Sequence, residues 1–387
     1  GAGLPRTTLV TQLTPQQVAQ VLALAAACAT ADGRPALSEQ TLLHARYGEP
    51  AASGESNWVL VETNTPDASA LLGVAHWDPV GEIPDATRSA EAAPVDVDDR
   101  PRSAPNVDHS VTGDWAVAPW ARADADQPSP VVAALLAGLR RAAPAGAVVD
   151  GWVHGAATWS ARTLHAWETH PEMRQGPGQP PPQLQLVRTL WQMRRPLTGP
   201  DVDLDAVPVP APDQILALTD PRAQELGVLV AAPDEQASMP QLRVRTFHVG
   251  VDEASWLQVN ARAFATHPEQ GRWTAADLTA RQHEDWFDPA GFFVAERVSE
   301  PSAPGRMVGF HWTKVHAPTD MVPVDGGSSP PEHVPVEPPS GLGEVYVLGV
   351  DPSEQHTGLG RALARIGLAY LRRRGVPTAM LYVEADN

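Results

Sequence analysis

The residues with the clearest chemical potential lie between Glu344 and Arg361. Residues 346–350 are short, β-branched and apolar enough for a buried strand; Asp351-Pro352 ends that strand, and Gln355-His-Thr-Gly-Leu-Gly360 follows. Glycines in the last segment allow positive φ and close ligand approach, so successive N–H groups at a helix start can converge on phosphate oxygens. The stretch therefore predicts a strand, an anion-binding loop and a helix, in that order.

The glycine spacing separates this loop from two common nucleotide-binding loops. Gly-Leu-Gly lacks the third glycine of a dinucleotide fingerprint and the Gly-Lys-Ser/Thr of a nucleotide-triphosphate loop. An ordinary strand-to-helix turn is the alternative for the glycines alone. The wider pattern, Val350-x-Pro352 and then Gln355-x-x-Gly358-x-Gly360 entering a helix, resembles the acetyl-CoA signature of the GCN5-related N-acetyltransferases.

A closer resemblance covers residues 245–387. The segments His267-Pro-Glu-Gln270, Trp286-Phe-Asp-Pro289, Gly309-Phe-His-Trp-Thr-Lys-Val-His316 and Leu381-Tyr-Val-Glu384 are similar to those of the mycothiol synthase family. These two-domain acetyltransferases act on a cysteinyl-glucosaminyl-inositol. The resemblance implies acetyl-CoA as co-substrate and N-acetylation of the cysteinyl amine, the last step of mycothiol biosynthesis. Acetylation of another small amine and non-catalytic acyl-CoA binding are the alternatives.

Glu344 is the predicted general base. An α-amino group with a pKa of about 7.7 to 8.0 is mostly protonated at neutral pH, and a positioned carboxylate suffices to remove its proton before attack on a thioester. Glu344 begins the strand that leads into the loop, and it lies within Leu-Gly-Glu-Val-Tyr, a motif of the resembled family. An exposed glutamate at a strand end is the alternative.

The remaining site residues follow from the resemblance. The backbone of Leu348, Gly349 and Val350 is expected to pair with the pantetheine arm, one N–H polarising the thioester carbonyl. The other expected cofactor-binding residues, most of them around the pyrophosphate, are Gln355, His356, Thr357, Gly358, Leu359, Gly360, Arg361 and Asn387. The expected acceptor-binding residues are Glu39, Glu269, Lys314 and Tyr382, whose polar groups suit a sugar and an inositol.

Composition limits the remaining possibilities. The 28 basic and 46 acidic residues give a formal charge of −18, which argues against nucleic acid and anionic membrane as partners. The histidines near the motifs lack a cysteine or carboxylate framework at zinc spacing, so no metal is predicted. The apolar segment 18–29 has no basic region before it and is too short to span a bilayer. We therefore expect a cytoplasmic protein, monomeric, with small-molecule substrates only.

Both halves of the chain repeat one order of elements. The first half predicts a helix at 15–29, strands at 58–62, 71–77 and 113–119, a helix at 131–141 and a strand at 147–154. The second half predicts a helix at 253–264, strands at 291–296, 307–314 and 343–352, a helix from 361 and a strand at 378–384. This order predicts an α+β fold with two tandem GCN5-related N-acetyltransferase domains, each a mixed β-sheet flanked by helices.

The predicted domains are 1–196 and 241–387, with residues 197–240 as linker. The loop of the first domain, residues 120–130, has two acidic residues, prolines and no glycine, so that domain is predicted to be non-catalytic. The second domain is predicted to be incomplete after its fifth strand, because the first continues through a helix near 156–167 and strands at 184–187 and 190–194. Its last strand would then have an unpaired edge. Residues 79–107, 174–182 and 318–339 are predicted as surface insertions.

Overall fold

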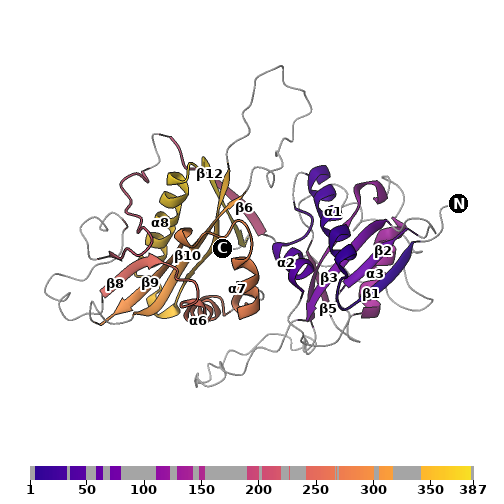
Figure 1. Ribbon diagram of the computed structural model, residues 1–387, viewed down its shortest axis with the longest axis horizontal. Coiled ribbons are helices and arrows are strands. Elements are labelled where there is room, and N and C mark those ends of the chain that lie inside the picture. The colour runs from indigo at the N-terminus through magenta and orange to yellow at the C-terminus, as the bar shows by residue number, and fades with distance from the viewer. Residues whose placement is uncertain are drawn as a thin grey trace, which may run out of the picture. The chain divides into compact units, whose positions relative to one another are not determined.

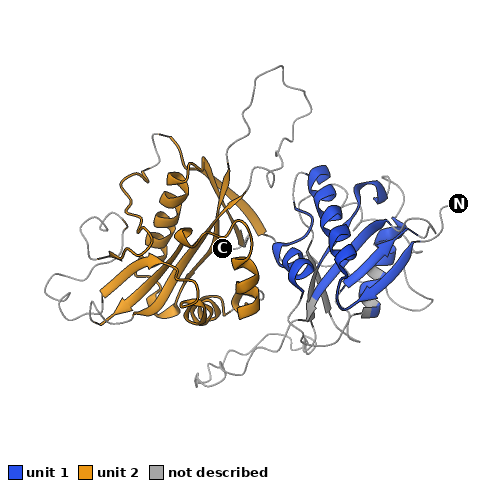
Figure 2. Cartoon of the chain, viewed as in Figure 1, with its two compact units in different colours: residues 1–185 blue, residues 186–387 orange. Residues whose placement is uncertain are grey.

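The computed structural model divides the chain into two compact units, Gly1–Gln185 and Leu186–Asn387 (Figure 2). We describe each unit by itself. The residues that the structure describes are 5–32, 35–48, 58–63, 70–79, 110–122, 129–142, 148–152, 190–199, 203–218, 226, 241–265, 267, 270–299, 305–316 and 341–384.

The first unit is a five-stranded sheet whose strands follow one another in chain order (Figure 1). All neighbours are antiparallel except the last pair, which is parallel. The strands are β1 (Arg6–Val10), β2 (Trp58–Glu62), β3 (Leu71–Pro79), β4 (Ser110–Val117) and β5 (Val148–Trp152). The helices are α1 (Pro15–Asp32), α2 (Glu39–Tyr47) and α3 (Pro130–Ala142), and the 3-10 helix η2 (Pro119–Ala121) follows β4.

Alternation along β2 explains how the helices of this unit cover both faces of its sheet. Trp58 and Leu60 pack with residues of α1, whereas Val59 and Val61 pack with residues of α3. Successive side chains of a strand point to opposite faces, so the four consecutive apolar residues 58–61 need cover on both sides.

The second unit is a seven-stranded mixed sheet in the order β6-β12-β11-β10-β9-β8-β7. Only β11 and β12 run parallel. The strands are β6 (Leu190–Pro196), β7 (Leu216–Ala217), β8 (Gln241–Thr246), β9 (Phe292–Val298), β10 (Arg306–His316), β11 (Leu342–Val350) and β12 (Thr378–Glu384). The helices are α6 (Glu253–Ala263), α7 (Ala275–Gln282) and α8 (Leu359–Arg373), with 3-10 helices η5 (Gln270–Arg272), η6 (Pro289–Gly291) and η8 (Pro352–Glu354).

Two cores hold this sheet between its helices. On one face α8 contributes residues such as Leu363 and Ile366 to a cluster with Phe293 of β9. On the other face Trp256 of α6 and Leu278 of α7 pack with aromatic residues of the strands. The order of helices and strands therefore confirms the predicted α+β fold with two sheets flanked by helices.

Strand β6 corrects the predicted domain boundary. Residues 190–196 were assigned to the first domain, but β6 pairs antiparallel with β12 of the second unit along seven residues, with Gln192 opposite Tyr382. The prediction that β12 would have an unpaired edge is therefore wrong. A free strand edge carries N–H and C=O groups that need partners, and a segment of matching length supplies them.

The predicted linker also differs from the structure in its described part. Leu197, Leu204, Val207 and Leu216 are buried in the core beneath α8, so this proline-rich stretch packs on the second unit. Apolar side chains at these positions make burial more favourable than an extended spacer. The predicted insertions, except Pro79, and the predicted elements at 156–167 and 184–187 lie outside the described residues.

Candidate active site

A β-bulge in β11 shapes the centre of the site. Trp312 of β10 is paired with Val347 and the next residue, Thr313, with Val345, so Tyr346 is an extra residue in β11. Bulges bend a strand and often lie beside active sites. On its other edge β11 pairs with β12 only from Leu342 to Glu344. In the described part of the chain, residues 345–350 thus keep a strand partner on the β10 side alone.

The side chain of Glu344 is buried where the two strands stop pairing. Glu344 is 8% exposed and its partner across β12 is Met380. Its Oε2 lies 2.7 Å from Nε2 of His316, the last residue of β10. A carboxylate held this way at a strand fork is placed to take up a proton from a substrate.

Lys314 lies on the same sheet face as Glu344, because the two residues are partners across β10 and β11. Its ammonium is 4.4 Å from the ring centroid of Trp286 and 5.4 Å from that of Tyr346. Arg281 of α7 donates to the Tyr346 hydroxyl at 2.6 Å. The cation and the aromatic rings form one wall beside Glu344.

Tyr382 belongs to this face too, two residues beyond Met380 on β12. Its side chain is 49% exposed, and its hydroxyl accepts a hydrogen bond from Gln192 Nε2 at 2.9 Å. The structure therefore brings together three predicted residues, Glu344, Lys314 and Tyr382, on one face of the sheet.

The loop after β11 has the backbone of an anion-binding turn. His356 has φ 64° and Gly358, the N-cap of α8, has φ 86°. The first backbone bond of the helix runs from Ala362 N–H to Gly358 C=O at 3.0 Å. The three preceding N–H groups have no acceptor within the helix, as at every helix start, and are available to a ligand.

Of the two glycines in this loop, Gly358 has a positive φ and Gly360 does not. A Cβ at Gly360 would lie 3.5 Å from Val350 Cγ2, an ordinary contact. Positive φ therefore does not explain the glycine at position 360. Close approach of a ligand to the backbone remains as the reason for Gly360.

Ion pairs hold the segment between β11 and the glycine loop in place. Asp351 caps η8 and accepts from Arg262 Nε at 2.8 Å, while Glu354 accepts two bonds from Arg297 at 2.9 and 2.8 Å. Burial of Asp351 opposes its ionisation, but hydrogen bonds from Ser353 and Arg262 outweigh burial and lower the pKa of this carboxyl. Both carboxylates are thus neutralised by arginines, which limits their repulsion of an anionic ligand in the loop.

The comparisons with known proteins agree with this geometry. Residues 256–387 match the model of the Acetyltransferase (GNAT) family. The mycothiol acetyltransferase of Thermobifida fusca is 40% identical over 375 residues, which cover 97% of this chain and 88% of that protein. The mycothiol acetyltransferase of Streptomyces coelicolor is 37% identical over 386 residues, covering 100% of this chain and 89% of that protein.

The chain belongs to the mycothiol acetyltransferase family. It is therefore an acetyltransferase. Among solved structures, a GCN5-related N-acetyltransferase from Sphaerobacter thermophilus aligns at 19% identity with a TM-score of 0.45, covering 98% of this chain and 87% of that one.

Three further residues of this mycothiol acetyltransferase homologue were predicted to bind acceptor or cofactor. Glu269 and Asn387 lie outside the described residues. Glu39 is the first residue of α2 in the first unit, behind the N-cap Ser38. The prediction that these residues bind acceptor or cofactor is not tested by the structure.

His316 is a candidate site residue that sequence reasoning missed. The metal-ligand spacing of the histidines gives it no role, whereas Lys314-x-His316 places two polar residues on one strand face next to Glu344. Within the described part of the chain, no group of three or more His, Cys, Asp and Glu residues could hold a metal ion.

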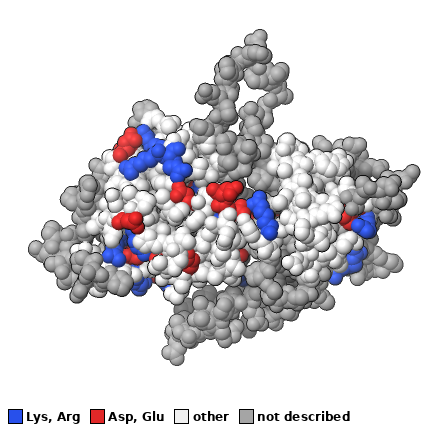
Figure 3. All heavy atoms as spheres, in the orientation of Figure 1, with Lys and Arg blue, Asp and Glu red and all other residues white. Residues whose placement is uncertain are grey.

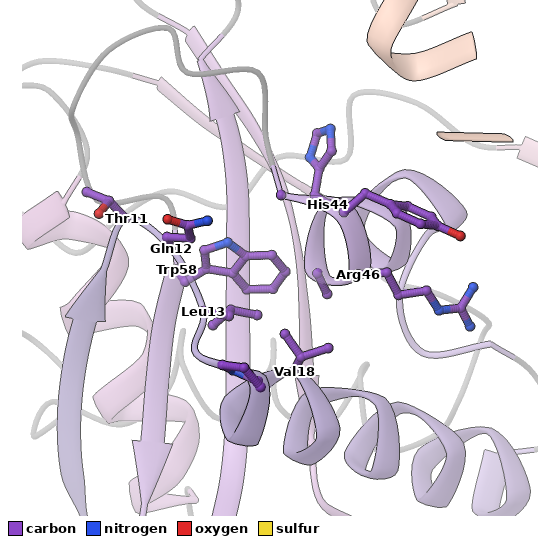
Figure 4. A pocket seen from close by; sticks show the side chains of 11 residues that line it. Thr11, Gln12, Leu13, Val18, His44, Arg46 and Trp58 are labelled. Atoms are coloured by element: carbon purple, nitrogen blue, oxygen red, sulfur yellow. The ribbon is translucent and has the colours of Figure 1, made fainter. Parts of the chain in front are cut away.

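The first unit of this family member contains a separate cavity of about 450 Å³, between the ends of β1 and α2 and the starts of α1 and β2. Figure 4 shows the Trp58 indole between Gln12 and the side chains of His44 and Arg46. Of the described residues that line it, none carries a carboxylate. The lining does contain the imidazole of His44, a side chain that can accept a proton.

On the face drawn in Figure 3, basic and acidic side chains of the described residues are interspersed. None of the helices within the described ranges is long and apolar enough to cross a membrane.

Proposed function

We propose that the second unit transfers the acetyl group of acetyl-CoA to the cysteinyl amine of a cysteinyl-glucosaminyl-inositol. The observation that carries the proposal is the placement of buried Glu344 at the fork of β11 and β12, with the anion-binding loop at the far end of the same strand. Residues 345–350 span about 20 Å, at about 3.3 Å per residue. An extended thioester arm whose phosphates occupy the loop would lie along this strand and end near Glu344.

The chemistry assigned to the residues is a proton removal followed by acyl transfer. Glu344 takes a proton from the acceptor ammonium, and the neutral amine attacks the thioester carbonyl. The bond between carbon and nitrogen forms, the bond between carbon and sulfur breaks, and CoA leaves as its thiolate. The nitrogen then gives up a second proton, which passes to the thiolate, so that the products are the neutral amide and free CoA. A backbone N–H among Leu348, Gly349 and Val350 stabilises the negative charge on the carbonyl oxygen.

The acceptor is proposed to lie against Lys314 and Tyr382. The Lys314 ammonium and the Tyr382 hydroxyl are side chains that donate hydrogen bonds, and they share the face of Glu344. The rings of Trp286 and Tyr346 offer apolar contact to the faces of a sugar. This placement supports a polyhydroxylated amine as acceptor.

The first unit is proposed to bind no acetyl-CoA. Val117-Ala118-Pro119 corresponds to Val350-Asp351-Pro352, since each ends its strand before a 3-10 helix. In the second unit the parallel pairing ends at Glu344, six residues before Val350. In the first unit β4 pairs with β5 as far as Asp114, only three residues before Val117, and β4 has no bulge against β3. Less of this strand is open to an extended arm.

The turn after β4 is also occupied by the protein's own side chains. Arg122 holds Asp32 through two hydrogen bonds, at 2.5 and 2.8 Å. Its Nε also donates to Val117 C=O at 3.0 Å. Arg122 stands at the position of Gln355, so its cationic group is already paired where a phosphate would need it.

The function is tested by incubating the protein with acetyl-CoA and single amines while free CoA is measured. We expect release that depends on cysteinyl-glucosaminyl-inositol, with a product heavier by one acetyl group on its amine. Release with an aminoglycoside or polyamine instead would favour a different acceptor. Acetyl-CoA binding without turnover of any amine would favour a non-catalytic role.

A further inference from the structure

His316 and Glu344 form a close pair at the strand fork. The atoms Nε2 and Oε2 are 2.7 Å apart, and the two side chains are 17% and 10% exposed. A hydrogen bond in such a sheltered position is stronger than one in water and is less open to exchange with solvent. The contact therefore fixes the orientation of the carboxylate.

The register of β10 and β11 keeps His316 and Glu344 close to each other. His316 is the partner of Leu342, and Glu344 is the partner of Lys314, so His316 and Glu344 are diagonal neighbours on one face. Diagonal side chains on paired strands remain within reach of each other when one of them is long. Within the described residues the imidazole engages Oε2, which leaves Oε1 for the acceptor.

We propose that His316 is a positioning residue for the base: its Nε2–H donates to Oε2 of Glu344 and keeps Oε1 directed at the acceptor ammonium. This inference rests on the proposed role of Glu344. The proton removed from the ammonium goes to Oε1, and Nε2 keeps its own proton. No bond to His316 forms or breaks during the reaction.

Other ionisable groups surround the pair, and the experiment has to hold them constant. They are Lys314 on β10, Tyr346 on β11, Tyr382 on β12 and Arg281 on α7. All four are unchanged in the variants below. Differences between the pH profiles of the variants therefore report His316 alone.

Three substitutions distinguish loss of the hydrogen-bond donor from loss of side-chain volume. His316→Gln keeps an N–H at the reach of Nε2, His316→Asn is one carbon shorter, and His316→Leu has no donor. We expect kcat to fall by about tenfold to hundredfold in the Leu and Asn variants, the range for losing one hydrogen bond to a charged group. The Gln variant is expected to stay within about fivefold of the wild type, since its donor is preserved.

The pH dependence gives a second readout that lost packing would not move. The acidic limb of the kcat/KM profile is expected to shift to higher pH in the Leu and Asn variants, because a donor to the ionised carboxylate has been lost. The shift should be absent with Gln. The KM for acetyl-CoA is expected to stay within about twofold throughout, because His316 does not touch the loop.

A matched histidine serves as control. His248→Leu alters a side chain that is 42% exposed, and it should leave both kcat and the pH profile unchanged. Wild-type activity in His316→Leu, or equal losses in the Gln and Leu variants, would overturn the inference. If the Leu variant fails to fold, the comparison of Gln with Asn decides. A wild-type enzyme without turnover of cysteinyl-glucosaminyl-inositol would instead overturn the proposed function.

Discussion

Glu344 is the proposed general base of the second unit. We expect Glu344→Gln to lower kcat by about a hundredfold or more, because the amide cannot accept the ammonium proton. Acetyl-CoA affinity, measured by calorimetry, should remain close to that of the wild type. The exposed Asp205, which pairs with Arg372, offers an isosteric control in Asp205→Asn. An unchanged rate across the pH range would remove Glu344 from the mechanism.

His311 is a second residue whose environment makes a measurable prediction. It is fully buried beneath α8, and its Nδ1–H donates to Leu363 C=O at 2.7 Å. Burial lowers the pKa of His311 from 6.5 to about 4. The folded protein thus holds a neutral imidazole at pH values where the unfolded chain binds a proton. The resulting stability is complete above pH 6.5 and is lost as the pH falls from 6.5 toward 4.

The loss from this one group amounts to about 3 kcal/mol of unfolding free energy. It can be measured by urea unfolding at pH 7 and at pH 4.5. In His311→Asn, where the side chain keeps a donor for Leu363 but does not titrate, the difference between the two pH values should be smaller. An equal difference in both proteins would show that other groups cause the acid sensitivity.

At the scale of the element, the two glycines between β11 and α8 are expected to have different roles, one in backbone conformation and one in ligand approach. Gly358→Ala is expected to lower both the melting temperature and acetyl-CoA affinity, because φ 86° strains an L-residue. Gly360→Ala should leave the melting temperature nearly unchanged, because its Cβ meets only an ordinary contact. Its effect should appear in acetyl-CoA binding. Unaltered binding in both variants would exclude the loop as the cofactor site.

Local patterns predicted many of the elements. β2 and β12 have the predicted bounds, and α8 begins two residues before the predicted Arg361. The bulge at Tyr346 could not be predicted, because it depends on how β10 and β11 pair and not on the residue itself. The same holds for the proposed role of His316, which depends on two strands placing it beside Glu344.

Strand β6 shows most clearly what local sequence patterns cannot predict. Residues 190–194 were identified as a strand from composition, and β6 runs from Leu190 to Pro196. Its place in the second sheet depends on β12, far along the chain, and no local pattern contains that pairing. The predicted boundary at residue 196 followed from assuming that neighbouring segments share a domain.

At the scale of the whole molecule, the proposal predicts one cofactor per chain. Calorimetric titration with acetyl-CoA should give a stoichiometry near one, because within the described ranges the open strand and the glycine loop occur in the second unit alone. The Gly358→Val variant, in which a β-branched residue occupies the left-handed position, should then bind none. Two sites in the wild type, with one left in the variant, would show that the first unit also binds the cofactor.

The pairing of β6 with β12 also affects how this protein is made. Gln192 and Tyr382, which face each other in the finished sheet, are 190 residues apart. At about 5 to 20 residues per second, a ribosome needs about 10 to 40 s to add the intervening chain. During that time β6, with Trp191 and Met193 on its surface, is outside the ribosome without its partner strand. The first sheet can form while this happens, so the nascent chain passes through a stage with one folded unit and one exposed apolar strand, which is the stage most open to aggregation.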